Sequence, residues 1–341
     1  MRAIFCSLLL ISALCACGGA TTTQMQGLTP DRIATSVARR VTPVHVDRGR
    51  SWMSPELQHA EIPVLFVSDS GTADVYIYKL PSLKLVGTVT GFSQPQGECS
   101  DNKGNVWVTD ASAQTIYELS HRGHLENELS DPTGYPVGCA WDPLTGSLAV
   151  MNIFDTGSAG GVVLVYSHGS QQGQPYENSS QYFYNFGGYD NNGNLFFDGR
   201  DADGSFMLSE LPKGASSAHT VKLSGGTIYF PGMVEWDSTK QYLIVGDQSC
   251  GNVYTSCVYT VKIGGKSGAI TRRVDLSGFD GGSVCDLVQG VQYNNQLAGS
   301  DDDFCNSTAN STDMWSWPRG GVPSRYNDTS DVTPVGAAIS R

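Results

Sequence analysis

The sequence is poor in charged residues and poorest in basic ones. Only 16% of its 341 residues are charged, and 21 Lys and Arg stand against 33 Asp and Glu, which gives a net charge of −12. Nucleic-acid binding depends on clustered Lys and Arg that neutralise phosphates. Nucleic acid is therefore not expected as a partner. A cationic ligand or a divalent metal is easier to accommodate, although the same acidity also serves simply to keep a surface soluble.

Motifs of several common catalytic sites are also missing. The chain has no Cys-x-x-Cys, no Gly-x-Ser-x-Gly elbow, no phosphate loop and no His-Glu-x-x-His. Its His residues fall in the N-terminal segment or in predicted outer strands and hairpins, so none is placed for general base catalysis in a channel. An apolar run from Ala3 to Leu14 is too short to span a bilayer as a helix.

The N-terminus has the features of an export signal. After Arg2 and the apolar run comes Leu14-Cys15-Ala16-Cys17, which resembles the end of a bacterial lipoprotein signal. The resemblance implies cleavage before Cys17, acylation of Cys17 and a lipid-anchored position in the cell envelope, at the outer membrane or cell surface. Two or three acyl chains hold a protein stably on a membrane. The alternative is an ordinary secretory signal cut near Ala16 or Ala20.

What the sequence has in abundance is glycine and aromatic residues. The 40 Gly and 15 Tyr favour many short strands joined by tight turns. We divide the chain into a signal peptide at 1–16, a lipidated Cys with a tether and N-terminal extension at 17–60, and one β domain at 61–341.

A repeat of short strands runs through this β domain. Its best-preserved copy extends from Gln94 to Leu119 and contains a tight hairpin loop at 102–105. A glycine that opens the innermost strand recurs six times, at Gly97, Gly138, Gly187, Gly232, Gly290 and Gly336. Such units cannot bury both faces alone, and radial stacking solves this. The prediction is an all-β, six-bladed β-propeller; a seventh blade could come only from the stretch before Ile62.

The two ends of the repeat complement each other. The first recurring strand, Val64 to Asp69, has no Gly-led strand before it, and the last such element, Thr333 to Ile339, has no outer strands after it. The C-terminal strand is therefore expected to become the innermost strand of the first blade. This would close the ring and remove an open edge.

The best copy also carries a family resemblance. Residues 97–110 read Gly-x-x-x-Asp-x-x-Gly-Asn-x-Trp-Val-x-Asp, which resembles NHL-type propellers, streptogramin lyases, and the gluconolactonase and senescence-marker-protein family. The resemblance covers roughly residues 62–340. It implies that the loops entering the innermost strands and those leaving the second strands share one face around a central channel. The resemblance says little about activity, because proteins that share a fold often differ in function.

Acidic residues recur where the second strands end. The candidates for ligand or metal binding on this face are Asp69, Asp110, Asp198, Arg200, Asp201, Asp247 and Asp301. Such carboxylates suit Ca²⁺, or a metal that polarises a lactone carbonyl. Alternatively, each Asp caps the following turn by accepting backbone N–H bonds. Arg200 is either a charge partner of Asp201 or Asp203, which is the favoured interpretation, or the group that orients an anionic ligand.

Aromatic residues near the strand entries suggest a further binding surface. They are Tyr135, Phe183, Tyr184, Tyr189, Tyr229, Phe230 and Trp236, and they either stack on a sugar, peptide or other organic ligand or pack between blades. The leading hypothesis is a binding module for a protein, peptide or glycan on the acidic loop face, without catalysis. The second is a metal-dependent hydrolase of the lactonase type, for which no Glu stands at the first-blade position used by the resembling family.

Six cysteines remain after export, an even number in an oxidising compartment. Cys250 and Cys257 flank a short loop and are the first expected pair. Cys285 with Cys305 would join two loops of the last blade. Cys99 and Cys139 occupy equivalent positions on neighbouring innermost strands and can pair if their side chains face each other.

Overall fold

The structure is a computed structural model. It describes Val46 and residues 51–59, 62–155, 160–251, 255–281, 284, 286–302, 310–328 and 330–341. The predicted signal peptide and lipidation site at Cys17, and the pair Cys285 and Cys305, lie outside the described residues.

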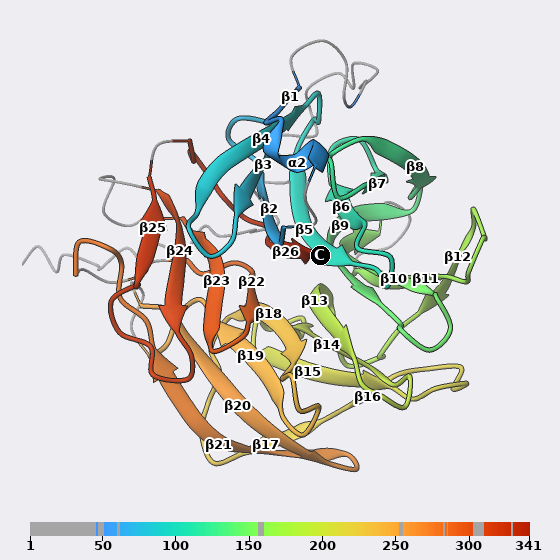
Figure 1. Ribbon diagram of the computed structural model, residues 1–341. Helices are drawn as coiled ribbons and strands as arrows, with labels where there is room; N and C mark the ends of the chain where they lie inside the picture. Colours follow the sequence, from blue (N-terminus) through green and yellow to red (C-terminus); the bar gives the residue numbers. More distant parts are fainter. Residues whose placement is uncertain are drawn as a thin grey trace, which may run out of the picture.

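Six small sheets stand around a central axis and form a six-bladed β-propeller (Figure 1). From the centre outwards, blade 1 consists of β26 (Ala338–Ser340), β2 (Val64–Asp69), β3 (Asp74–Lys79), β4 (Lys84–Thr90) and β1 (Trp52–Met53). Blade 2 consists of β5 (Pro95–Ser100), β6 (Val106–Asp110), β7 (Thr115–Leu119) and β8 (Leu125–Ser130). Blade 3 consists of β9 (Gly134–Trp141), β10 (Leu148–Asp155), β11 (Val162–Tyr166) and β12 (Gly173–Tyr176).

The second half of the ring repeats this order. Blade 4 consists of β13 (Phe183–Tyr189), β14 (Leu195–Arg200), β15 (Phe206–Leu211) and β16 (His219–Thr220). Blade 5 consists of β18 (Pro231–Trp236), β19 (Leu243–Asp247), β20 (Cys257–Gly264), β21 (Ser267–Asp275) and β17 (Lys222–Ser224), the last pairing parallel to β21. Blade 6 consists of β22 (Gly290–Tyr293), β23 (Gln296–Asp301), β24 (Ser311–Ser316) and β25 (Arg325–Asn327).

The second strand of each blade forms the buried middle of the fold. In β2, β6 and β19 every residue is buried, because each blade is covered by a neighbour on both faces. Strands buried on both sides read as continuous apolar runs rather than alternating ones. This explains why short apolar runs such as Val64 to Asp69 recur along the sequence.

The glycines of the innermost strands mark close contact between blades. A Cβ atom at Gly97 would meet the carbonyl oxygen of Val137 in blade 3 at 2.5 Å, and one at Gly138 would collide with the carbonyl of Asn185 in blade 4. Glycine is therefore required for backbone to approach backbone. In blade 4 this position is taken by Gly188, one residue beyond the predicted Gly187, since a bulge in β13 shifts the register.

The C-terminal strand closes the ring as predicted. β26 pairs antiparallel with β2, so that Leu65 lies opposite Ile339 and Phe66 opposite Ala338. In Figure 1 the red C-terminal strand lies beside the blue first strands, near the middle of the ring. First and last segments of the propeller thus share one sheet.

Part of the N-terminal extension packs on blade 1. β1 adds to β4 as an outer strand, and the short helix α2 (Glu56–His59) places Glu56 in ion pairs with Lys79 at 3.2 Å and Lys84 at 2.7 Å. No helix in the described ranges is long and apolar enough to cross a membrane.

Candidate functional site

The predicted acidic positions lie at the ends of second strands on one face of the ring, here called the entry face because the chain enters each innermost strand there. Of these residues, the buried ones are Asp69, Asp110, Asp198, Asp247 and Asp301. They are less than a tenth exposed, so they form a layer beneath the surface rather than an open acidic ring.

At Asp69, Asp110 and Asp247 the carboxylate holds an entry loop. Asp110 accepts backbone N–H bonds from Ser93 at 2.7 Å, Gln94 at 2.9 Å and Ala113 at 3.0 Å. Ser93 and Gln94 lead into the innermost strand, whereas Ala113 lies in the turn after the second strand. Burial raises the pKa of Asp110, and these N–H donors oppose that shift. One side chain thus fixes both segments, as the turn-capping alternative describes.

Two further blades repeat this arrangement. Asp247 accepts N–H bonds from Tyr229 at 2.9 Å, Phe230 at 3.0 Å and Ser249 at 2.9 Å. Asp69 accepts them from Gly71 and Thr72 in the following turn and from Val332 and Thr333 in the last entry loop. In blade 3 the position belongs to Asn152, whose amide donates to Asp131 at 2.9 Å.

Asp198 joins two blades. Its Oδ1 accepts from the backbone N–H of Phe186 at 2.9 Å and its Oδ2 from that of Gly232 in blade 5 at 3.0 Å. The residue is completely buried, and burial raises the pKa of its carboxyl well above the ordinary value while the two N–H groups lower it.

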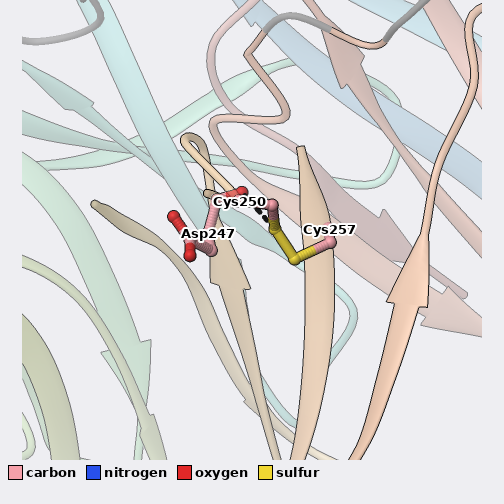
Figure 2. Close-up of side chains that lie close together, drawn as sticks. All are labelled: Asp247, Cys250 and Cys257. Carbon is pink, nitrogen blue, oxygen red and sulfur yellow. Dashed lines mark hydrogen bonds between the residues drawn. A yellow bond between two sulfur atoms is a disulfide. The ribbon is translucent and has the colours of Figure 1, made fainter. Parts of the chain in front are cut away.

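A metal site on this face finds little support in the described residues. Within them, one group of three side chains has ligand atoms close enough together, namely Asp247, Cys250 and Cys257. Figure 2 shows that the two cysteines are joined in a disulfide, so they offer no thiolate. The carboxylate of Asp247 already accepts backbone N–H bonds from its entry loop. This group therefore does not fit Ca²⁺ or a catalytic metal.

Arg200 has different neighbours from those expected. Asp201 instead caps its own turn, accepting from the backbone of Asp203 at 3.0 Å and of Ser205 at 2.8 Å. Among the described residues Arg200 forms no ion pair, so the local pair with Asp201 or Asp203 is wrong. Its Cζ lies 5.0 Å from the ring centre of Phe183 and 4.8 Å from that of Phe230.

These rings extend into a row along the entry face. Phe183 meets Phe154 edge to face at 5.4 Å, and Phe154 meets Tyr135 in the same way at 6.3 Å. We call Tyr135, Phe154, Phe183, Arg200 and Phe230 the aromatic–arginine row. Except for Phe230 its members are half-buried rather than buried. Of the other aromatic candidates, Tyr229 is 52% exposed, whereas Tyr184 and Trp236 pack in the core.

Burial and the rings together define the chemistry of Arg200. Burial lowers the pKa of its guanidinium, but an arginine remains charged at neutral pH. A guanidinium stacked on ring faces keeps its planar edge of N–H donors available for a carboxylate. Phe154, between two predicted aromatics, was missed because it lies at an exit from a strand rather than at an entry.

Two predicted disulfides are present. Cys250 pairs with Cys257 across the loop between β19 and β20. Cys99 pairs with Cys139, and their Cα atoms lie 5.6 Å apart, which links the innermost strands of blades 2 and 3. Both pairs confirm the expectation from spacing and register.

Comparison with known proteins supports the fold alone. Neither a family model nor a curated protein sequence matches this chain. A chain in the crystal structure of a nidogen/laminin complex is similar, with a TM-score of 0.65, 13% identity, and coverage of 82% of this chain and 98% of that one. A protein of unknown function from Bacteroides caccae has a TM-score of 0.61 and 13% identity over 82% of this chain and 100% of that one. The expected resemblance to NHL and gluconolactonase families stays a prediction.

Proposed function

We propose that this chain is an exported, lipid-anchored propeller that binds a partner protein on its entry face and does so without catalysis. The aromatic–arginine row would form the centre of that contact, and the guanidinium of Arg200 would bind a carboxylate of the partner. Acylation at Cys17 would keep the propeller at the membrane surface.

The observation that carries this proposal is the isolation of Arg200. Within the described part of the chain the guanidinium has no carboxylate partner, although it is half-buried and its Cζ lies 5.0 Å from the ring centre of Phe183 and 4.8 Å from that of Phe230. A charge that is partly removed from water is costly unless a counter-charge compensates it. A carboxylate brought by a partner supplies that compensation.

The composition of the row favours a protein as the partner. Tyr, Phe and Arg are enriched in the cores of protein interfaces, and Tyr and Arg are frequent hot spots. The exposed ring of Tyr229 extends the surface beside Phe230. The chain of similar fold in the nidogen/laminin complex belongs to an assembly of proteins, so the architecture is compatible with this use.

Peptide display tests the proposal. We expect selection of a random peptide library on the purified protein to enrich sequences containing Asp or Glu. Arg200→Gln should weaken binding of a selected peptide at least about tenfold, which corresponds to about 1.4 kcal/mol. Arg200→Lys should recover only part of the loss, because a lysine keeps the charge but cannot stack as a planar group.

Arg325→Gln is the matched control, since Arg325 is an exposed arginine on the outermost strand of blade 6. It should bind the selected peptides as the unmodified protein does. Peptides that bind Arg200→Gln equally well would overturn the role of the row. Enrichment on a glycan array with no peptide enrichment would replace the protein partner by a glycan, and turnover of lactones would contradict a purely binding function.

A further inference from the structure

A cavity of about 310 Å³ lies at the opposite end of the central axis from Arg200. It is lined by the carboxyl ends of all six innermost strands, including Glu98, Trp141, Tyr189, Glu235, Gln292 and Ile339. Its volume is in the range of sites for small organic ligands. No sequence pattern singled it out, and it lies outside the proposed protein-binding face.

The deepest charged group of the cavity is Glu98. The residue is 1% exposed, and neither of its carboxylate oxygens has a hydrogen-bond partner in the described chain. Its backbone is held firmly, because Gln289 of blade 6 accepts from the Glu98 N–H at 2.8 Å and donates to its carbonyl at 2.6 Å. The same Gln289 oxygen accepts from Ala337 at 3.1 Å. A buried acid is thus positioned by three blades and left unsatisfied.

A second acid stands on another wall. The carboxylate of Glu235 accepts from the backbone N–H of Gln292 at 3.0 Å, and the buried side-chain amide of Gln292 lies near the same carboxylate. Burial raises the pKa of Glu235 to about 7, and nearby Lys240 and Arg341 oppose this. Lys240 and Arg341 also line the cavity and are exposed, so the basic groups lie at its mouth and the acids lie deeper.

The remaining walls are aromatic and small. Trp141, Tyr189 and Trp236 come from three neighbouring blades, and the Cys99–Cys139 disulfide fixes the strands on one side. Ring faces attract an ammonium group and pack against methylene groups. The charged side chains that line the cavity are Glu98, Glu235, Lys240 and Arg341. The strands β9, β13 and β22 contribute no charged side chain to the lining.

We infer that this cavity binds a small zwitterionic amine, whose ammonium group reaches Glu98 and whose carboxylate stays at the mouth with Lys240 and Arg341. The ammonium satisfies the acid that the fold leaves without a partner. The acidic side chains lie deep in the cavity and the basic side chains lie at its mouth. This arrangement selects a molecule that carries both a positive and a negative charge. The site does not depend on the entry face.

Proton release accompanies binding in this arrangement. Burial raises the pKa of Glu98 well above its ordinary value, and the backbone amide of Ala338, which lies near the carboxyl without forming a hydrogen bond to it, opposes this rise only in part. An arriving ammonium favours the ionised carboxylate, so the proton leaves to solvent as the ligand enters. The structural alternative, a permanently neutral Glu98, predicts no such release.

Calorimetry with three probes tests the inference: ε-aminocaproate, which carries both charges, n-hexylamine, which carries the positive one, and caproate, which carries the negative one. We expect ε-aminocaproate to bind most tightly and caproate least. The binding heat of ε-aminocaproate at pH 7 should depend on the ionisation enthalpy of the buffer, because a proton is released. Glu98→Gln should weaken binding at least about tenfold and reduce that buffer dependence to the part that Glu235 contributes, because burial raises the pKa of Glu235 to about 7.

Further variants separate the two ends of the site. Arg341→Gln should weaken ε-aminocaproate and leave n-hexylamine unchanged, whereas Glu235→Gln should weaken both. Glu126→Gln, an equal charge change on the exposed outer strand β8, should alter neither. Absence of binding by both amines, equal binding to Glu98→Gln in a variant that retains its melting temperature, or equal affinity for caproate would each overturn the inference.

Discussion

At the scale of single residues, the propeller is organised by carboxylates that bond to backbone rather than to ligands. Asp198 shows this most clearly, because it spans blades 4 and 5 with one oxygen for each. Each N–H that loses its acceptor in a buried site costs about 1–3 kcal/mol. Such a residue therefore contributes to the cohesion of the ring.

Replacement of Asp198 should lower the stability of the fold. Asp198→Ala removes both acceptors and is expected to lower the free energy of unfolding by about 2–5 kcal/mol, whereas Asp198→Asn retains one acceptor and should lose less. Urea unfolding followed by circular dichroism measures both. Asp201→Ala is the control, since Asp201 caps an exposed turn whose N–H groups water can reach. Equal losses for Asp198→Ala and Asp201→Ala would show that the bond between blades adds nothing.

The sequence anticipated some of these residues and not others. It placed Asp69, Asp110 and Asp247 correctly at the ends of second strands, and capping was one of two interpretations that the residues allowed. It could not decide between them, because the donors at 93–94, 229–230 and 332–333 are distant along the chain. Glu98 was missed for a related reason: a single acid in a strand does not reveal whether it faces solvent or a central cavity.

At the scale of elements, strands and turns were predictable, whereas few contacts between blades were, the Cys99–Cys139 disulfide being the exception. Buried second strands and tight hairpin loops can be predicted from the local sequence. The shift from Gly187 to Gly188 depends on a bulge in β13, and the place of Phe154 depends on how blades 3 and 4 pack. Those features arise from twist and side-chain packing across the ring, which no periodicity encodes.

Closure by β26 leads to a test at this scale. Deleting residues 333–341 leaves β2 without its inner partner and removes the Thr333 N–H group that donates to Asp69. We expect a lower melting temperature and aggregation through the exposed edge, measured by calorimetry and light scattering. A chain ending at Ser340 keeps β26 complete and should behave nearly as the full chain. An unchanged melting temperature after the longer deletion would contradict closure.

At the scale of the whole molecule, the ring presents two separate faces. The aromatic–arginine row lies on the entry face, the acid-lined cavity opens on the other, and Gln289 ties blades 6, 1 and 2 together between them. The six-bladed arrangement was predictable from the repeat. The cavity was not, because it is the joint product of six strand ends.

The proposed lipid anchor at Cys17 would determine how the propeller is displayed. Cys17→Ser should abolish labelling with a radioactive or clickable fatty acid and move the protein from the membrane fraction to the soluble exported fraction, since no acceptor thiol remains. Cys15→Ser is the matched control and should leave labelling intact. Labelled Cys17→Ser protein would refute the assignment of the anchor.

Ring closure also has a consequence in time. Ribosomes make the chain from the N-terminus, so blade 1 is the first sheet to be synthesised and the last to be completed. At about 5–20 residues per second, β2 waits on the order of tens of seconds for its partner β26. During that interval the newborn chain carries an open edge, and its protection depends on whatever keeps the early blades apart from other chains until the final residues arrive.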